Sequence, residues 1–373
     1  MENTNPTNPF PGDVIKQELE KRGWTHEDLS KILGRPRPVI TNIILGKTVI
    51  TPTTAQELSV ALGGTADYWL KLESDYQLSQ SIDDTGMIRE RAKLYEFAPL
   101  KEMQRRGWIT STDDFEDIEK QLCDFFHVSS VDESPKLEVA MRTSKTHTNE
   151  ATRAQITWCY RCLYLASALL VKQYDPDMVR KAIPDLRKLA TRQEWVKEIP
   201  RFLTELGIRF VVVEQLPKTK IDGAALWMND SPIIALSLRF DRIDNLWHNV
   251  FHELFHILNN DGYRLDLEPD DETPIDEIDE VEKRANDESA DALIPTGVLD
   301  SFIRRVSPFY RRERIIQFAN RNKIHPGIVI GQLQHRKEIS WKSNKEFLVN
   351  VRDIIKKTAL TDGWGCTIGR SER

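Results

Sequence analysis

The stretch that decides the fold is LWHNVFHELFHIL, residues 246–258, which carries two histidines and a glutamate among apolar side chains. His252 and His256 are four residues apart, so on an α-helix both imidazoles lie on one face, where they can bind one metal ion. Glu253 points to the side of this pair and can reach a metal-bound water. The alternative is an ordinary helix with two surface histidines, but the apolar residues around them argue against full exposure.

A third metal ligand is expected farther along the chain, because a catalytic zinc ion has three protein ligands and one position open for water. The candidate is Glu282, in EVEKRANDESADALIP (residues 280–295), and Asn286 lies on the same helix face, where it would support a ligand. This donor set predicts Zn2+, although manganese and iron also accept it. The competing interpretation is a solvated acidic helix, preceded by an acidic surface loop over 266–280.

Residues 10–80 are predicted to form short helices that stop at glycines such as Gly23, Gly34 and Gly46. The turn at Gly34 joins two helices of the length found in a helix-turn-helix. In such a motif the second helix lies in the major groove of DNA, with its N-terminal residues on the base edges. A small helical bundle that binds another protein is the alternative interpretation.

The expected DNA contacts follow from that geometry. Arginine binds guanine through two hydrogen bonds and asparagine binds adenine, whereas lysine holds phosphates. The predicted base-reading residues are Arg35, Arg37, Thr41 and Asn42, and the predicted phosphate-binding residues are Lys31 and Lys47. The inward face of the second helix would carry Val39, Ile40, Ile43 and Ile44.

The composition is typical of a folded protein rather than a membrane protein. Of 373 residues, 40% are hydrophobic and 29% are charged, and no apolar run approaches the roughly 20 residues of a membrane span. The N-terminus lacks the basic and apolar regions of a signal peptide, so a cytoplasmic protein without membrane contact is expected. The net charge is -6, so nucleic-acid binding must use a local basic face.

The four cysteines are too few and too scattered for a disulfide framework, which fits a reducing compartment. Cys159 and Cys162 form a C-x-x-C, a spacing compatible with a redox or metal-binding pair. The preferred interpretation is two small apolar residues on a buried helix face, because the sequence has neither a second C-x-x-C nor a strand before this one.

The character of the sequence changes twice after the N-terminal helices. Residues 81–200 are predicted to be mostly helical, whereas the apolar runs IRFVVVEQL, GAALWMN and PIIALSLR are predicted strands. The expected fold class is therefore α+β. The expected domains are a helix-turn-helix domain over 1–80, a helical scaffold over 81–200, a domain with a small sheet over 201–300, and a helical region packed on it over 301–373.

Residues 12–78, from GDVIKQELEKRGWTHEDL to DYQL, resemble the lambda-repressor-like (XRE) helix-turn-helix domain of HigA-type antitoxins. The segment TPTTAQELSVALG and the Trp69 that closes it are more specific to this group than the helix-turn-helix alone. Such domains usually dimerise on palindromic operators. The resemblance therefore implies double-stranded DNA and a second copy of the chain as partners.

The pattern HELFH, followed by E-x-x-A-N and then LIP, resembles the ImmA/IrrE family of gluzincin-like metallopeptidases. The resemblance covers residues 200–300, and it implies three zinc ligands and a general base. The implied ligands are His252, His256 and Glu282, and the implied base is Glu253.

Further segments resemble longer proteins that join a HigA-type domain to this peptidase domain. They are Arg142 with Ser144, the stretch GAALWMNDSPIIALSLR, and the stretch IHPGIVIGQLQ. With these segments included, the resemblance to the fused proteins extends over most of the chain.

Two positions depart from the metallopeptidase pattern. Phe255 stands where that family most often has glycine, and Glu288-Ser289 where it usually has an aromatic residue followed by alanine. Neither replaces a ligand, so they bear on activity rather than on the fold. The nearby candidates for stabilising an oxyanion are His248 and Tyr263, and a structural role is the preferred interpretation for each.

Together these features predict a cytoplasmic transcriptional regulator of a bacterium or phage with an appended zinc peptidase. Its substrate would be a repressor or the chain itself, in a stress, phage-related or toxin-antitoxin response. The alternative is a HigA-like antitoxin or repressor whose zincin-like domain only binds a toxin or senses a signal. A third interpretation is a repressor with a purely structural metal site. The expected partners are operator DNA, a toxin or repressor protein, and a second copy of the chain.

Overall fold

The chain divides after Lys93 into two units, Met1–Lys93 and Leu94–Arg373, which are described one at a time. The computed structural model describes residues 9–80, 82–135, 152–262, 264–267 and 280–365. Arg142, Ser144 and Tyr263, which the sequence singled out, lie outside the described residues.

The first unit is a bundle of five helices, which confirms the short helices predicted for this part of the chain. They are α1 (Pro11–Arg22), α2 (His26–Leu33), α3 (Arg37–Ile44), α4 (Pro52–Leu62) and α5 (Ala66–Gln80). Local sequence sets the bounds of α2, because Thr25 and Asp28 form a reciprocal capping box at its start and Gly34 ends it with a φ of 64°. The turn at Gly34 leads directly into α3, as a helix-turn-helix requires.

One apolar core holds the five helices together, and each of them contributes to it. Its members include Ile15, Leu19, Leu29, Ile40, Ile43, Ile44, Leu58 and Trp69. The predicted inward face of α3 is confirmed for Ile40, Ile43 and Ile44, while Val39 is half-buried at its edge. Trp69 also donates from Nε1 to the carbonyl of Gly63 at 3.0 Å, which ties α5 to the end of α4.

The second unit contains a five-stranded mixed sheet with the order β4-β2-β3-β1-β5. The strands are β1 (Arg209–Val213), β2 (Ile221–Met228), β3 (Ser231–Leu236), β4 (Arg264–Leu267) and β5 (Leu360–Asp362). β1 is parallel to β3 and β5, whereas β2 is antiparallel to β3 and β4. The three predicted strands are confirmed as β1, β2 and β3. β4 was not predicted, and it includes the first residues of the expected acidic loop, of which 268–279 lie outside the described residues.

Helices make up most of the rest of the second unit, so the mixed α+β class is confirmed. α6 (Ile82–Phe97) crosses from the first unit into the second. The others are α7 (Leu100–Arg105), α8 (Phe115–Phe126), α9 (Arg153–Ser167), α10 (Pro176–Leu189), α11 (Ile199–Glu205), α12 (Ile243–Asn259), α13 (Glu280–Leu293), α14 (Thr296–Val306), α15 (Arg312–Asn322), α16 (Pro326–His335) and α17 (Arg352–Ile355), with the short 3-10 helices η1 (Gln193–Glu198) and η3 (Lys345–Phe347). The H-E-x-x-H residues lie on α12, and Glu282 lies in the first turn of α13.

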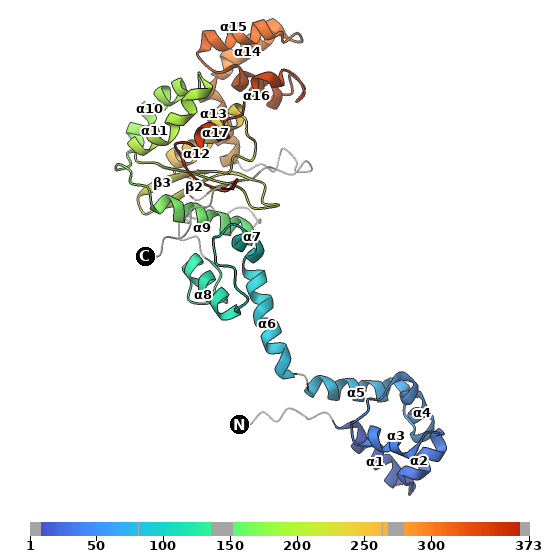
Figure 1. The fold of residues 1–373 in the computed structure, drawn as a ribbon. Helices are drawn as coiled ribbons and strands as arrows, with labels where there is room; N and C mark the ends of the chain where they lie inside the picture. Colours follow the sequence, from blue (N-terminus) through green and yellow to red (C-terminus); the bar gives the residue numbers. More distant parts are fainter. Residues whose placement is uncertain (1–8, 81, 136–151, 263, 268–279, 366–373) are drawn as a thin grey trace. The chain divides into compact units, whose positions relative to one another are not determined.

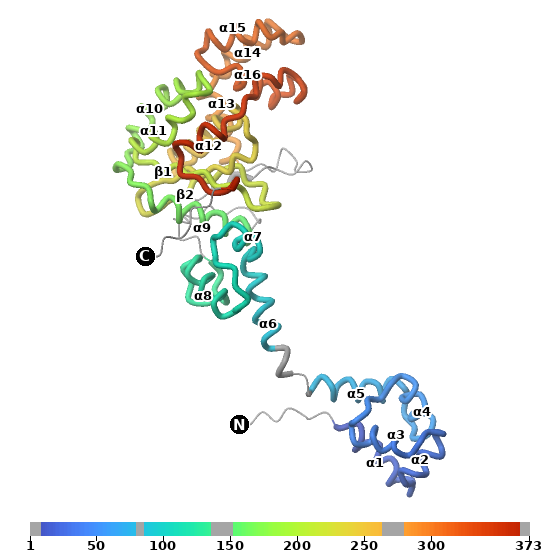
Figure 2. The backbone as a smooth tube through the Cα atoms, in the orientation of Figure 1, coloured from blue at the N-terminus to red at the C-terminus, as the bar shows by residue number. Residues whose placement is uncertain are grey.

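Helices cover both faces of the sheet, with α9 on one side and α12 on the other (Figures 1 and 2). Successive strand residues point to opposite faces. In β1, Val211 and Val213 accordingly belong to the core shared with α9, while Phe210 and Val212 belong to the core shared with α12. Because both faces are buried, the strands are continuous apolar runs rather than alternating ones.

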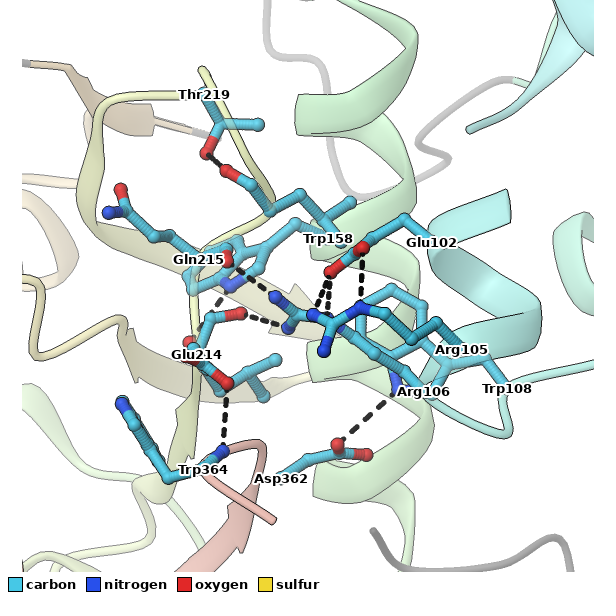
Figure 3. A network of polar contacts seen from close by, with 12 residues as sticks. Glu102, Arg105, Arg106, Trp108, Trp158, Glu214, Gln215, Thr219, Asp362 and Trp364 are labelled. Carbon is cyan, nitrogen blue, oxygen red and sulfur yellow. Dashed lines mark hydrogen bonds and ion pairs between the residues drawn. The ribbon is translucent and has the colours of Figure 1, made fainter. Parts of the chain in front are cut away.

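Polar contacts fasten the α7–α9 layer to the edge of the sheet (Figure 3). Arg106 donates to the backbone carbonyls of Glu214 and Gln215, just after β1, at 2.6 and 2.7 Å. On α9, Arg161 Nε donates to the buried carboxylate of Asp362 on β5 at 2.6 Å. The contact of Arg161 helps to hold β5 beside β1, although the two strands are far apart in the sequence.

Cys159 and Cys162 of α9 are fully buried in the core between this helix and the sheet. Burial raises the pKa of the Cys162 thiol, which keeps it protonated and unreactive. The C-x-x-C therefore serves as packing, as the preferred interpretation has it.

The expected ranges 81–200, 201–300 and 301–373 all contribute to this one unit. The first of them is divided between the two faces of the sheet, since α9 packs on one face and α10 on the other. The sequence could not show this division, because it depends on which apolar faces meet in three dimensions. Within the described part of the chain, no helix is long and apolar enough to cross a membrane.

Candidate metal centre and DNA-binding surface

The H-E-x-x-H motif lies on α12, a helix that is buried along almost its whole length between the sheet and α16. The polar residues of the motif are buried as well as the apolar ones. His252, Glu253 and His256 are each at most 1% exposed. The alternative of two surface histidines is therefore excluded. Buried polar side chains need polar partners, because burial without them is costly.

α13 brings the third predicted ligand to this face of α12. Nε2 of His252 lies 2.9 Å from Nε2 of His256. Oε2 of Glu282 lies 3.2 Å from the first of these nitrogens and 3.3 Å from the second. The three predicted donor atoms thus converge on one point, although Glu282 comes from a separate helix.

The geometry of this triangle fits a zinc ion. Zinc-nitrogen and zinc-oxygen bonds are about 2.0–2.2 Å long, so neighbouring donors on a tetrahedron lie about 3.3 Å apart. The three separations of 2.9, 3.2 and 3.3 Å are close to that value. Two imidazoles and one carboxylate are also a donor set that zinc accepts, with one coordination position left for water.

The charge state of Glu282 also suits a ligand. Burial would raise the pKa of Glu282, but hydrogen bonds and charge interactions with His252 and His256 outweigh it and hold the pKa well below its usual range. A carboxylate must be deprotonated to bind a metal. The Glu282 side chain is 25% exposed and the two imidazoles only 1%, so solvent reaches the centre from the α13 side.

A carboxylate that the sequence reasoning missed supports His256 from behind. Oδ2 of Asp261 lies 3.0 Å from Nδ1 of His256, and its other oxygen binds Arg284 of α13. A carboxylate at Nδ1 fixes the tautomer in which Nε2 would be free to bind a metal ion. The sequence held a signal for this contact: Asn260 ends α12 with a φ of 55° and turns the next residue back toward the helix.

Asn286 was predicted to support a ligand, and the structure places it beside His248. Oδ1 of Asn286 lies 3.1 Å from Nε2 of His248, and the hydroxyl of Ser289 lies 3.1 Å from Nδ1 of the same ring. Both ring nitrogens therefore join α12 to α13, which favours a structural role for His248. Burial, with the nearby His252 and His335, lowers the pKa of His248 to about 3.

Glu253 lies between α12 and the sheet, against Gly223 of β2. A Cβ placed at residue 223 would lie only 2.5 Å from Oε1 of Glu253 and 3.0 Å from Leu236. Glycine is unfavourable inside a strand, and here it leaves room for a carboxylate. Glu253 follows His252 directly in α12, so the two side chains leave the helix in different directions.

The two departures from the metallopeptidase pattern have structural explanations. Phe255 is 9% exposed and packs in the core around α12. Glu288 accepts a hydrogen bond from Nδ2 of Asn259 at 2.7 Å, which ties α13 to the end of α12. Ser289 is fully buried and uses its hydroxyl on His248. Glu288 and Ser289 thus fasten α12 to α13, and none of the three residues displaces a predicted ligand.

The predicted DNA-contacting residues lie on and around α3 of the first unit, and they differ in exposure. The exposed ones are Lys31, Arg37, Asn42 and Lys47, and the half-buried ones are Arg35 and Thr41. Glu27 lies 3.2 Å from Lys31 and 3.8 Å from Arg37. Such exposed ion pairs contribute little stability, so phosphates or bases can replace them.

Arg35 departs from the prediction. Its guanidinium binds both carboxylate oxygens of Glu57 on α4, at 2.7 and 3.1 Å. This two-bond contact uses the donors that would bind guanine. In the structure Arg35 therefore joins α4 to the turn before α3, instead of pointing toward a base. Its carbonyl also accepts a hydrogen bond from Ser30 at 2.7 Å, which fixes the same turn.

Known proteins resemble the chain in its helix-turn-helix. Residues 15–69 match the family model described as helix-turn-helix. The chain is 26% identical over 83 residues to an uncharacterized HTH-type transcriptional regulator, YddM, of Escherichia coli strain K12, a match that covers 22% of this chain and 88% of the relative. It is 32% identical over 97 residues to antitoxin HigA-1 of Vibrio cholerae serotype O1, covering 25% of this chain and 89% of that protein.

Among solved structures, an addiction module antidote protein of a HigA family from Coxiella burnetii is 28% identical, with a TM-score of 0.21. That similarity covers 22% of this chain and 92% of the other.

A five-helix bundle with an exposed α3, matched by the helix-turn-helix model, defines a DNA-binding transcriptional regulator. By its identity to HigA-1 over most of that protein's length, the chain belongs to the HigA antitoxin family. The similarity to HigA-1 covers 25% of the chain, so it says nothing about what most of the second unit does.

Proposed function

We propose that this regulator binds an operator through its first unit and carries a zinc-dependent, gluzincin-like peptidase in its second. One observation carries the proposal: two buried imidazoles and a carboxylate converge at tetrahedral spacing beside a buried glutamate. Two imidazoles and a carboxylate are a donor set that zinc accepts, and a nearby base would give the ion a chemical use.

The residues divide the chemistry among them. His252, His256 and Glu282 would hold the ion, and Asp261 keeps His256 in the tautomer that ligation needs. A bound zinc ion supplies a Lewis acid and a water whose pKa is lowered to about 7. Glu253 would accept the proton of the attacking water and then donate it to the leaving amine as the peptide C–N bond breaks.

The expected substrate is a regulatory protein, either a partner repressor or the part of this chain between its two units. The reason is the covalent joining of the two units. A tether raises the effective concentration of the peptidase near proteins that sit on the same DNA.

The test compares the wild-type protein with Glu253→Gln, both loaded with zinc. Each is incubated with candidate partner proteins, and new fragments are sought by mass spectrometry. Fragments are expected from the wild type alone, because glutamine cannot accept the water's proton, while both proteins bind equal zinc. Identical fragment patterns from the two proteins would contradict the proposed peptidase activity, and the metal would then be a structural or sensing element.

Gly223→Ala sharpens this test. The added Cβ would meet Oε1 of Glu253 at 2.5 Å, so we expect hydrolysis to fall while zinc binding stays. Overpacking should also lower the free energy of unfolding by about 1–3 kcal/mol. Gly297→Ala is the control, because a Cβ there meets nothing within 4 Å. Loss of zinc from Gly223→Ala would mean that this residue supports the ligands rather than the base.

A second candidate function is an antitoxin whose second unit binds a toxin or senses a signal without hydrolysis. The 32% identity to a protein named as an antitoxin favours it. In that case a toxin should co-purify equally with the wild type and with Glu253→Gln, and neither should produce fragments. For either function we expect two copies of the chain on a palindromic operator, which sedimentation of the protein-DNA complex measures.

A further inference from the structure

Outside the two sites above, residues 304–314 form a strongly basic surface between α14 and α15. Their sequence is RRVSPFYRRER, with five arginines against one acidic residue, Glu313, in a chain whose net charge is -6. The arginines are Arg304, Arg305, Arg311, Arg312 and Arg314, and all five are exposed. We call residues 304–314 the basic tip.

The fold holds the basic tip in place. The rings of Phe302 on α14 and Phe318 on α15 stack at 4.2 Å, so the two helices lie side by side, as Figure 1 shows. Within the tip, the hydroxyl of Tyr310 donates to Oε2 of Glu338 at 2.5 Å, which anchors the segment to the end of α16. The arginines therefore project from an ordered base rather than from a loose loop.

The positive charge of the basic tip is largely uncompensated. Among the described residues, Arg304, Arg305, Arg311 and Arg314 make no ion pair, and Arg305 Nε donates only to the carbonyl of Ser301. Arg312 differs, because its guanidinium lies 5.3 Å from the ring of Phe347 and 3.8 Å from Glu346. On α1, by contrast, both basic residues of the last turn bind Glu18.

Three of these charges oppose the dipole of α15, whereas Arg304 and Arg305 lie in the last turn of α14, where positive charge suits the dipole. Arg311 is the N-cap of α15, and Arg312 and Arg314 lie in its first turn. The N-terminus of a helix carries partial positive charge, so arginines there repel it and destabilise the helix. A bound anion would relieve the repulsion, which indicates that the basic tip is suited to an anionic partner.

We infer that the basic tip is a second, sequence-independent contact with the phosphate backbone of duplex DNA. The inference rests on the operator binding proposed for the first unit, which brings DNA to a tethered second unit at high effective concentration. Arginines without base-reading geometry bind phosphates regardless of sequence. The second unit would thereby be held on the DNA on which its proposed protein substrates lie.

The test measures how the affinity of the full-length protein for a random-sequence duplex depends on salt. The variant carries Arg304→Gln, Arg305→Gln, Arg311→Gln and Arg314→Gln. Each lost phosphate contact lowers the slope of log K against log salt by about 0.9, so a fall of about 2–4 is expected. The matched control removes four exposed basic residues of the α10–α11 region, through Lys181→Gln, Lys188→Gln, Lys197→Gln and Arg201→Gln, and should keep the wild-type slope.

Additional arms separate the outcomes. The four corresponding lysine substitutions keep the charge and should keep the slope, and each Arg→Gln pair alone should give about half of the loss. If the wild type binds DNA normally and the glutamine variant keeps the same slope, the proposed DNA contact of the basic tip is wrong, but the operator proposal stands. Absence of salt-dependent DNA binding by the wild type overturns the operator proposal as well. Binding of both proteins to anionic phospholipid vesicles is also measured. If the glutamine variant loses vesicle binding but keeps the DNA slope, the basic tip contacts a membrane and the inference is wrong.

Discussion

The metal centre and the α3 surface differ in how firmly the fold holds their side chains. At the candidate metal centre the two imidazoles are buried and Glu282 is 25% exposed, and His256 is held by a carboxylate that an arginine holds in turn. On α3, Arg37 and Asn42 are exposed, and the one nearby ion pair of Arg37 is 3.8 Å long. Metal ligands must converge before the ion arrives, whereas groups that read DNA must remain accessible until the groove is reached.

Glu282→Ala should have the largest effect, because it removes one of three donors. Loss of a residue that hydrogen-bonds to a metal ligand lowers metal affinity by about 10–100-fold, so loss of the ligand itself should lower it further. Zinc affinity is measured by competition with a fluorescent chelator. Glu280→Ala, two residues earlier and exposed, is the control and should bind zinc like the wild type. Equal affinity in both variants would mean that burial at this site serves packing alone.

The next test compares two arginines in the first unit. Arg37→Ala should reduce affinity for a fragment of the protein's own promoter by about 1–3 kcal/mol, with unchanged thermal unfolding, if Arg37 reads a base. Arg35→Ala should instead lower the melting temperature, because it breaks the contact with Glu57. A different result would be reduced operator affinity of Arg35→Ala with an unchanged melting temperature. Arg35 would then contact DNA as Arg37 does, and the two arginines would not differ in role.

Asp261→Ala measures how much the contact between Asp261 and His256 contributes to zinc affinity. The ligands remain, but His256 loses the group that fixes its tautomer, so zinc affinity should fall by about 10–100-fold. Asp261→Asn keeps an acceptor oxygen for Nδ1 and should lose less. Asp287→Asn on the exposed side of α13 is the control. An Asp261→Ala protein with wild-type affinity would show that the helix alone orients His256.

The sequence predicted the features that depend on spacing within one element. The four-residue spacing of His252 and His256 placed both on one helix face, and the apolar residues of α3 indicated its inward side. Glu282 came from the resemblance and from the need for a third donor. The structure brings these three donors together.

Features that depend on contacts between elements could not be predicted. Arg35 and Glu57 are 22 residues apart, and nothing local indicates that they bind each other. β5 spans Leu360–Asp362, too short for a periodic pattern, and it is held by a contact with Arg161, 201 residues away. Asp261 was within reach of prediction, because a left-handed turn after a helix brings the next side chain back to its last turn.

The smallest expected effect concerns Glu102 on α7, whose carboxylate binds Arg105 at 2.6 Å and Arg106 at 2.7 Å (Figure 3). Hydrogen bonds from Arg105, and then from Arg106, lower the pKa of Glu102 to about 2 against an opposing contribution from burial. Its folded-state pKa lies below the unfolded value of 4.5, so the carboxylate stabilises the fold above that pH. This contribution is lost as the pH falls from 4.5 toward 2.

Glu102→Gln should therefore lower the free energy of unfolding at neutral pH by about 1 kcal/mol, since glutamine keeps an acceptor but no charge. The difference from the wild type should shrink as the pH falls below 4.5. Denaturant unfolding of the two proteins across this range measures it, with Glu96→Gln on the exposed side of α6 as the charge-matched control. If the difference in free energy of unfolding stays constant with pH, Glu102 stabilises the fold through packing and not through its charge.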